Sequence, residues 1–351
     1  MTTKDRNGKY QGVVVVLNPL DALGDDQVSE KIAANYTAIN LTAPNCDGKA
    51  ATDVANGVFN FIYLSPEIFL NNKTFEEIYL SPKFQSKLVL VVVDEAHMIY
   101  TWGMAETGQK VGKVSARHQD QGAFRISYGN LSSALLNKNK SPLLLMSATC
   151  PPKAIKAIKT SLKLEDSEID IIRGELTRPE IRILRIPMCK SLSSCEDISI
   201  LYAFAKDVPS SELVPSLIYS GTRHMTQTVL EILSVARGTP GEYKIADSLF
   251  GRRYHACTGK RDKEDRIADF GQSKFPIISC TLALGVGQNW RTVRQVVHIG
   301  RGDPSLICQM IGRGGRDGKP ALALLFMEPE RTGGKNSVSD FAIGPYDSDE
   351  D

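Results

Sequence analysis

The chain has 351 residues, of which 42% are hydrophobic and 23% are charged, and its formal net charge is +2. This length allows two domains of ordinary size, and the composition is typical of a globular protein. The small net charge excludes a strong overall attraction to nucleic acid, so any such surface must be a local groove. No apolar run approaches the roughly 20 residues of a membrane span, and the polar residues 1–10 do not form a signal peptide. We therefore expect neither a membrane partner nor secretion.

The seven cysteines are scattered along the chain without a C-x-x-C pair. This spacing argues against a zinc site and against a disulfide framework, and it favours a reducing compartment. Near the C-terminus the composition becomes polar, and residues 347–351 carry four carboxylates. We expect residues 331–351 to form a disordered acidic tail.

Two apolar runs near the N-terminus predict strands that lead into helices. Residues 12–17 are rich in valine, and Pro19 ends this run ahead of a helical pattern. Residues 59–64 form a second strand that leads into Ser65 and Pro66, a usual start of a helix. Each junction on its own is also an ordinary strand-to-helix turn.

The most informative stretch of the chain is residues 88–97. Six apolar residues, four of them valine, predict a strand buried on both faces of a parallel sheet, and the strand ends at Asp94 and Glu95, with His97 close behind. In open α/β sheets, ligands bind at the carboxyl ends of strands. An Asp there can hold Mg²⁺, and a Glu can orient and deprotonate an attacking water. The alternative is that the two carboxylates only cap the following helix.

The next elements complete a first domain and begin a second one. A strand at residues 143–146 precedes Ser147 and Thr149, and residues 170–172 predict the last strand of the first domain. A polar connector over residues 174–179 follows, and an alternating strand begins at Ile181. The repeated alternation of strands and helices predicts an α/β fold with mainly parallel sheets. We assign residues 1–175 to the first domain and residues 176–330 to the second.

The second domain carries polar motifs after its predicted strands. Residues 216–219 lead into Thr222 and Arg223, and a strand over residues 276–280 leads into Thr281. Two glycines follow, Gly285 and Gly287, and glycine lets a backbone closely approach either a phosphate or the other domain.

Residues 309–318 hold the second strong signal. They contain Gln309 and two arginines three residues apart, Arg313 and Arg316, which we expect on one face of a helix. A guanidinium can neutralise the charge that develops on a γ-phosphate. A generic basic patch is the alternative.

The order of these motifs resembles that of RecQ-type helicases of superfamily two. Asp94-Glu95-Ala96-His97 is similar to motif II, the Walker B or DEAH box, and residues 19–27 match the motif Ia pattern P-L-x-x-L-x-x-D-Q. The other similar segments are Ser65-Pro66 (motif Ib), Ser147-Ala148-Thr149 (motif III), residues 219–223 (motif IV), residues 281–289 (motif V) and residues 309–318 (motif VI). The resemblance covers residues 12 to 330 and implies two RecA-like domains.

The resemblance implies an ATP-dependent 3′-to-5′ DNA helicase that serves recombination and repair, with ATP and Mg²⁺ as cofactors and a junction of single-stranded and duplex DNA as partner. It assigns Mg²⁺ to Asp94, coupling between nucleotide and DNA to Ser147 and Thr149, and nucleotide contacts to Gly285 and Gly287. The implied hydrolytic residues are Asp94, Glu95, His97, Gln309, Arg313 and Arg316. The implied DNA contacts are Pro19, Gln27, Ser65, Pro66, Trp102, Phe124, Arg125, Tyr128, Thr222, Arg223 and Thr281.

Three further expectations follow from the same resemblance. Asp94, Ser147 and the motif VI helix should face one cleft between the two domains. Bases could stack on Trp102, Phe124 or Tyr128, although these aromatic residues could instead belong to the core. The expected compartment is the nucleus if the source is eukaryotic and the cytoplasm otherwise.

One family motif is missing from the 351 residues, because no G-x-x-x-x-G-K-[ST] loop (Walker A) occurs in them. That loop cradles the phosphates of ATP, so we expect this chain to be inactive alone. The alternatives are a non-hydrolysing nucleic-acid-binding pseudo-helicase or regulatory module, and an unrelated α/β NTPase with coincidental motifs.

Overall fold

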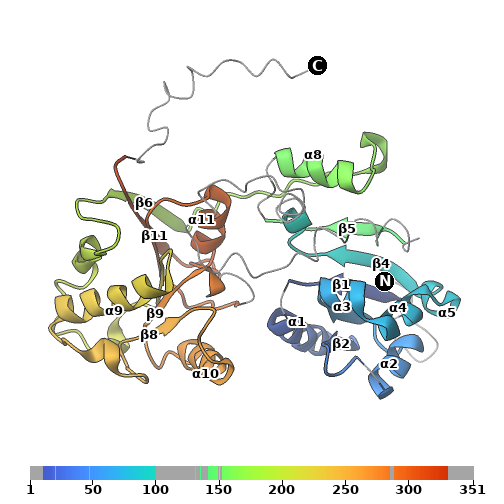
Figure 1. Ribbon diagram of the computed structural model, residues 1–351, viewed down its shortest axis with the longest axis horizontal. Helices are drawn as coiled ribbons and strands as arrows, with labels where there is room; N and C mark the ends of the chain where they lie inside the picture. The colour runs from blue at the N-terminus through green and yellow to red at the C-terminus, as the bar shows by residue number, and fades with distance from the viewer. Residues whose placement is uncertain are drawn as a thin grey trace, which may run out of the picture. The chain divides into compact units, whose positions relative to one another are not determined.

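The computed structural model describes residues 11–19, 21–46, 48–99, 131, 135, 141–148, 150, 152–284 and 288–330 (Figure 1). The chain forms two compact units, of which the first comprises residues 1–178, 283–289 and 304–309 and the second comprises residues 179–282, 290–303 and 310–351. Each unit contains a parallel sheet with helices packed against it, which confirms the predicted α/β fold.

The first unit is built on a parallel sheet of five strands. Its order is β2 (Ala38–Leu41), β3 (Phe61–Leu64), β1 (Val13–Leu17), β4 (Leu88–Val93) and β5 (Leu143–Leu145). The two valine-rich strands, β1 and β4, lie side by side in the middle of the sheet. Residues 13–17 are all buried, as expected for a strand covered on both faces, whereas Val89 of β4 is exposed.

Short helices with side-chain caps connect these strands. The N-cap residues of α3, α4 and α5 are Ser65, Asn72 and Ser81, and the side chain of each accepts a hydrogen bond from a backbone N–H of its helix. The helices of the unit are α1 (Asp21–Ala33), α2 (Gly48–Ala55), α3 (Pro66–Asn71), α4 (Lys73–Leu80), α5 (Pro82–Gln85), α8 (Pro152–Ser161) and the 3₁₀-helix η2 (Asp166–Glu168).

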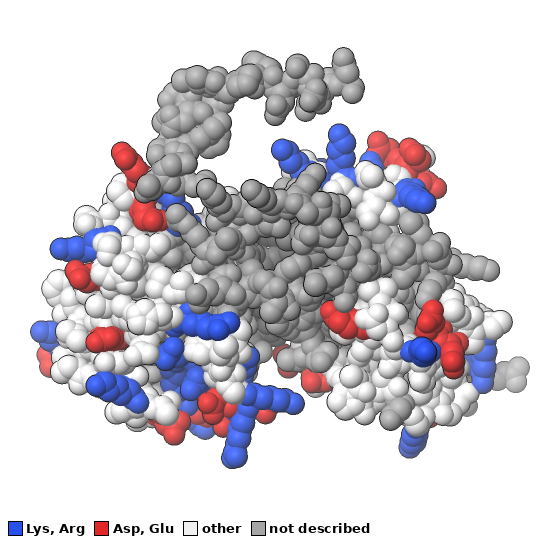
Figure 2. Space-filling view, in the orientation of Figure 1, with Lys and Arg blue, Asp and Glu red and all other residues white. Residues whose placement is uncertain are grey.

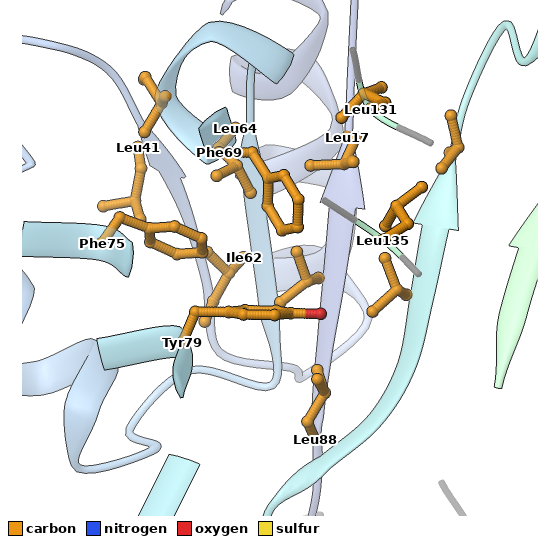
Figure 3. Close-up of a cluster of buried hydrophobic side chains, with 14 of the residues drawn as sticks. Leu17, Leu41, Ile62, Leu64, Phe69, Phe75, Tyr79, Leu88, Leu131 and Leu135 are labelled. Carbon is orange, nitrogen blue, oxygen red and sulfur yellow. The ribbon is translucent and has the colours of Figure 1, made fainter. Parts of the chain in front are cut away.

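The core of the first unit joins the helices α3 and α4 to the sheet. Figure 3 shows the rings of Phe69, Phe75 and Tyr79 pointing toward strand residues such as Ile62. The Phe69 and Tyr79 rings meet edge to face with centroids 5.1 Å apart, a favourable aromatic geometry. This packing fixes α3, and with it the motif Ib turn, against the strands.

One predicted strand is wrong. Residues 170–172 belong to an irregular segment, and Ile171 and Ile172 are 49% and 92% exposed. Residues 170–172 pair with no strand among the described residues. A short apolar run alone therefore does not distinguish a strand from an exposed connector.

The second unit is built on a parallel sheet of six strands. Its order is β6 (Ile181–Pro187), β11 (Ala321–Met327), β10 (Gln295–Ile299), β7 (Ser216–Tyr219), β9 (Ile277–Cys280) and β8 (Gly251–Tyr254). The helices that lie between β6 and β11 along the chain are α9 (Arg223–Arg237), α10 (Lys260–Gly271), α11 (Pro304–Ile311) and the 3₁₀-helices η3 (Glu196–Leu201), η4 (Ser210–Glu212), η5 (Glu242–Lys244) and η6 (Leu282–Leu284). The longest helix, α9, ends at Gly238, whose φ of +85° suits a glycine cap.

All seven cysteines are free thiols. No helix in the part of the chain that the structure describes is both long enough and apolar enough to span a bilayer.

The core of the second unit provides the first testable prediction. Phe250 is 1% exposed, meets the Tyr202 ring edge to face at 5.6 Å, and lies under the Arg237 guanidinium at 4.8 Å. Phe250→Ala should lower the free energy of unfolding by about 3–5 kcal/mol, measured by urea titration followed by circular dichroism. The matched control is Phe204→Ala, because Phe204 is 94% exposed in the same unit, and this change should cost less than about 0.5 kcal/mol. Equal losses in the two variants would contradict the assigned core.

Candidate functional site

The carboxyl ends of the first sheet gather four of the predicted motifs. All the strand pairs of this sheet are parallel, so their carboxyl ends lie at one edge. Asn18 follows β1, Ser65 follows β3, Asp94 follows β4, and Ser147 lies just after β5. Because β1, β4 and β5 are neighbours, the motif II loop lies between the loops that follow the other two strands.

Backbone hydrogen bonds hold the motif II loop on both sides. The Asp94 N–H donates to the Leu17 carbonyl at 3.0 Å, and the Ala96 N–H donates to the Met146 carbonyl at 2.8 Å. The Met146 N–H in turn donates to the Val93 carbonyl at 2.9 Å. The sheet ladder therefore extends beyond the strands and fixes the backbone of the loop.

Burial raises the pKa of Asp94, and the neighbouring Glu95 charge raises it further. The Glu95 N–H donates to Asp94 Oδ1 at 2.9 Å, and this bond and His97 act in the opposite direction on the pKa. Two adjacent carboxylates, one of them poorly solvated, are stabilised by a cation placed between them and the solvent.

Glu95 adopts an unusual backbone conformation. Its φ is +51°, in the left-handed region, which costs a non-glycine residue about 1–2 kcal/mol. Its Oε2 atom is buried without a hydrogen-bond partner among the described residues, and it lies 3.2 Å from His97 Nδ1. A strained backbone together with a poorly satisfied carboxylate is typical of a functional position.

His97 connects motif II to motif III. Its Nδ1 atom lies 3.0 Å from Ser147 Oγ and 3.2 Å from Glu95 Oε2. Which atom donates depends on the tautomer of the ring. The predicted coupling residue Ser147 therefore shares one imidazole nitrogen with the predicted catalytic Glu95.

Motifs Ia and Ib are held by local hydrogen bonds. Asn18 Nδ2 donates to Gln27 Oε1 at 2.9 Å, which joins the end of β1 to α1, and Pro19 is buried. Ser65 Oγ accepts from the Ile68 N–H at 3.4 Å and caps α3, with Pro66 at the first helical position. The capping interpretation of Ser65 is therefore correct, and its contact with DNA stays a prediction.

In the second unit, Arg253 of β8 is hydrogen-bonded to Arg223 of motif IV and to other residues of α9. Its guanidinium donates to Thr226 Oγ1 at 3.2 Å, to Gln227 Oε1 at 3.1 Å and to the Arg223 carbonyl at 3.2 Å. Burial lowers its pKa, and Arg266 adds to this effect. The sequence analysis missed Arg253. Two adjacent arginines in a strand of a parallel sheet were the available signal, because such strands are usually apolar throughout.

Thr222 and Thr281 were both predicted to contact DNA, and each makes a hydrogen bond within the protein. Thr222 is the N-cap of α9, and its hydroxyl accepts from the Met225 N–H at 3.2 Å. Thr281 is 2% exposed, and its N–H donates to the Tyr254 carbonyl at 3.2 Å.

The motif VI arginines do not share a helix face, so this expectation is wrong. Helix α11 ends at Ile311, and Arg313 and Arg316 lie in the turns that follow. Three glycines in residues 312–315 explain the difference, because glycine destabilises a helix interior and Gly315 has a φ of +63°. A side chain at Gly315 would also meet the Lys319 carbonyl at 2.8 Å.

An ion pair that the sequence did not reveal shapes the same turn. Arg294 Nη1 and Nη2 donate to Asp317 Oδ1 and Oδ2 at 3.0 and 2.5 Å, a bidentate geometry. This contact lowers the pKa of Asp317, whose Oδ1 also accepts from the Lys319 N–H. The Gly315 N–H donates to the Val293 carbonyl at 3.1 Å, so the turn is joined to the segment that leads into β10.

The charges of Arg313 and Arg316 in the motif VI turn act on the pKa of Tyr219. Burial raises the pKa of its hydroxyl, whereas Arg313 and Arg316 oppose that change. The hydroxyl is buried and has no hydrogen-bond partner in the described part of the chain.

Several predicted site residues lie outside the described residues. They are Trp102, Phe124, Arg125, Tyr128, Thr149, Gly285 and Gly287. A common cleft for Asp94, Ser147 and the motif VI segment stays a prediction, because it concerns the placement of one unit against the other.

The carboxylates of Asp94 and Glu95 are suitable ligands for a magnesium ion. Asp94 and Glu95 offer oxygen donors, which Mg²⁺ prefers, and its charge would offset the burial that raises the pKa of Asp94. Within the described ranges, no three His, Cys, Asp or Glu side chains are arranged as a ready-made metal site.

The chain is similar to one family model and to several known helicases. Residues 214–318 match the helicase conserved C-terminal domain. The chain is 27% identical over 331 residues to the ATP-dependent helicase wrn-1 of Caenorhabditis elegans, and the match covers 91% of this chain and 27% of that protein. It is 26% identical to the probable ATP-dependent DNA helicase RecS of Bacillus subtilis, with 91% and 56% covered, and 25% identical to the ATP-dependent DNA helicase RecQ of Pasteurella multocida, with 91% and 44% covered. The chain thus spans between about a quarter and a half of these relatives.

Solved structures agree on the fold. The Saccharomyces cerevisiae Dbp5 structure bound to RNA and ADP BeF3 aligns with a TM-score of 0.59 at 19% identity, covering 95% of this chain and 74% of that one. The DUF1998 helicase MrfA bound to DNA and AMPPNP aligns with a TM-score of 0.61 at 13% identity, covering 91% and 42%. The two sheets therefore have the RecA-like α/β fold.

The raised pKa of Asp94 predicts how the stability of the folded chain depends on pH. Its pKa is raised in the folded chain, so its favourable contribution to stability is present at low pH and is lost as pH rises through the raised pKa. Asp94→Asn stays neutral, so the variant should be more stable than the original chain at pH 7, and the gain should shrink toward pH 4. Urea midpoints at the two pH values measure this difference.

The control for Asp94 is Asp317→Asn. The folded pKa of Asp317 is lowered, so its contribution is present at neutral pH and is lost as pH falls. This variant should therefore be less stable than the original chain at pH 7. A loss of stability in Asp94→Asn at pH 7 would contradict the assigned environment of that carboxylate.

Proposed function

We propose that this RecQ-like chain, which carries a helicase conserved C-terminal domain, forms the ATP-driven motor core of a DNA helicase. The observation that carries the proposal is the contact among Glu95, His97 and Ser147 at the carboxyl edge of the first sheet. This contact joins the residues that would activate water to the residue that would transmit the outcome. RecS and RecQ, to which the chain is similar, are described as ATP-dependent DNA helicases.

In the proposed reaction, Asp94 would hold Mg²⁺, which neutralises charge on the β- and γ-phosphates of ATP. Glu95 would orient a water molecule and accept its proton as the water attacks the γ-phosphorus. The bond from that phosphorus to the bridging oxygen breaks, and ADP leaves with the oxygen. The Glu95 Oε2 atom has no hydrogen-bond partner among the described residues, so one of its lone pairs is available to the water.

His97 and Ser147 would transmit the effect of ATP hydrolysis to the rest of the first unit. Protonation of Glu95 removes the charge that faces His97 Nδ1 at 3.2 Å. The ring nitrogen would then interact mainly with Ser147 Oγ at 3.0 Å. Hydrolysis would thus change the hydrogen bonding at the end of β5.

Arg313 and Arg316 would stabilise the charge on the transferring phosphoryl group. A guanidinium serves this purpose only when its backbone is held. The Arg294–Asp317 pair and the Gly315–Val293 hydrogen bond supply that support in the second unit.

DNA would be the nucleic-acid partner, bound through motifs Ia, Ib, IV and V, mainly by its phosphates. The family resemblance supports 3′-to-5′ unwinding of duplex DNA at a single-strand junction, in recombination and repair. In a eukaryotic cell this work takes place in the nucleus, and otherwise in the cytoplasm.

A second candidate function is a nucleic-acid-binding module without hydrolysis. The observation that favours it is the lack of a G-x-x-x-x-G-K-[ST] sequence within the 351 residues. Without that loop, the β- and γ-phosphates lose a set of backbone N–H donors and a lysine charge. The 351-residue chain alone is then expected to release negligible phosphate from ATP.

Glu95→Gln tests the proposed catalytic role. In a protein that contains this chain together with a Walker A loop, the change should lower DNA-stimulated phosphate release at least about 100-fold, because the general base is lost. Glu77→Gln is the matched control, since Glu77 is an exposed glutamate of the same unit, and it should leave the rate unchanged.

Two outcomes would separate the candidates. Phosphate release that is equally fast in Glu95→Gln would sink the assigned role of this residue. Binding of DNA without any release, even with a Walker A loop present, would favour the non-hydrolysing module.

The proposed contact with phosphates predicts strong salt dependence of DNA binding. For a single-stranded oligonucleotide, the logarithm of the affinity should fall linearly with the logarithm of the salt concentration, with a slope of about −0.7 for each phosphate contacted. Fluorescence anisotropy with the 351-residue chain measures this slope. An affinity that stays constant as salt is raised would point to a partner other than DNA.

A further inference from the structure

Helix α8 carries a row of lysines outside all of the helicase motifs. Lys153, Lys156 and Lys159 recur every three residues on α8, which places them toward one side of the helix, and Lys163 follows in the turn after its last residue, Ser161. The other side buries Ala154 and Ile158. Figure 2 shows several blue side chains standing out over the position of α8.

A pocket of about 560 Å³ lies beside this row of lysines. Four cationic side chains and one carboxylate line it, so its net charge is +4 − 1 = +3. The lining residues are Pro152, Ile155, Lys156, Lys159, Thr160, Lys163, Leu164, Glu165 and Arg173. We call this site the α8 pocket.

Most of this positive charge is not neutralised by the protein itself. Lys159 pairs with Asp166. Lys156, Lys163 and Arg173 have no acidic partner among the residues that the structure describes. Like charges at such spacing weaken a helix, so the row is not there to stabilise α8.

The chemistry of the lining fits a phosphodiester. Lysine ammonium groups and an arginine fork bind phosphate oxygens. The apolar side chains of Pro152, Ile155 and Leu164 offer a surface for a sugar or a base. An acidic protein segment would match the charge but would leave this apolar surface unused.

We propose that the α8 pocket is a second nucleic-acid site, which binds the phosphodiester backbone apart from motifs Ia, Ib, IV and V. The proposal rests on the proposed function for the class of ligand. It adds a contact on the first unit that no motif supplies.

Lysine footprinting on the full 351-residue chain tests the site directly. The chain is acetylated with and without a single-stranded oligonucleotide, and modification of each lysine is measured by mass spectrometry. The oligonucleotide should protect Lys156 and Lys163 at least about 3-fold at low salt. The exposed lysines Lys49 and Lys73 of the same unit should stay equally reactive.

An equilibrium measurement with matched variants gives a second readout. Lys156→Gln/Lys163→Gln/Arg173→Gln should reduce the salt slope of oligonucleotide binding by about 2, because three contacts of about 0.7 each are lost. The control Lys49→Gln/Lys73→Gln/Lys153→Gln removes the same charge from exposed lysines that do not line the pocket, and it should leave the slope unchanged.

The outcomes separate this proposal from the proposed function. Binding without protection of Lys156 and Lys163, or equal slopes in the two variants, would overturn the α8 pocket and leave the helicase proposal standing. No binding of the oligonucleotide at all would overturn both.

One further result would identify a different occupant. If Asp347→Asn/Asp349→Asn/Asp351→Asn increases the reactivity of Lys156 and Lys163 in the absence of DNA, the acidic residues 347–351 occupy the pocket. That result would overturn the nucleic-acid assignment.

Discussion

The backbone hydrogen bonds that continue beyond β1, β4 and β5 are the constraint on which the first unit depends. They hold the motif II loop between the Leu17 and Met146 carbonyls, so Asp94 and Glu95 stand at the middle of the sheet edge. The surrounding core supports this arrangement, because the buried valines of β1 and β4 leave no room for the strands to slide. The position of each chemical group is thus set by the sheet and not by the loop alone.

Much of this arrangement could be predicted from the sequence. The run 13–17 and the second half of the run 88–93 are apolar because both faces of a central parallel strand are covered there, whereas Val89 is exposed near the start of its strand. The change from valine to Asp94 marks the end of the strand, where the site lies. Asp170-Ile171-Ile172 shows the limit of the method, since three residues carry too little pattern to reveal whether a partner strand exists.

The second unit was harder to predict because its supports are long-range. The residues of the Arg294–Asp317 pair are 23 positions apart, and those of the Arg253–Gln227 contact are 26 apart. No local periodicity encodes such pairs. The motif VI arginines were expected on a helix from their spacing, whereas the glycines between and around them favour a turn. Composition within the motif was therefore a better guide than the interval between its charged residues.

The left-handed backbone of Glu95 has a consequence for how this position can change over time. Glycine is the residue that its φ of +51° suits best, and glycine has no carboxylate. Selection for a more stable fold and selection for chemistry therefore favour different residues at this position. A lineage released from the need for hydrolysis would drift here first, and the identity of residue 95 would record whether that need persists.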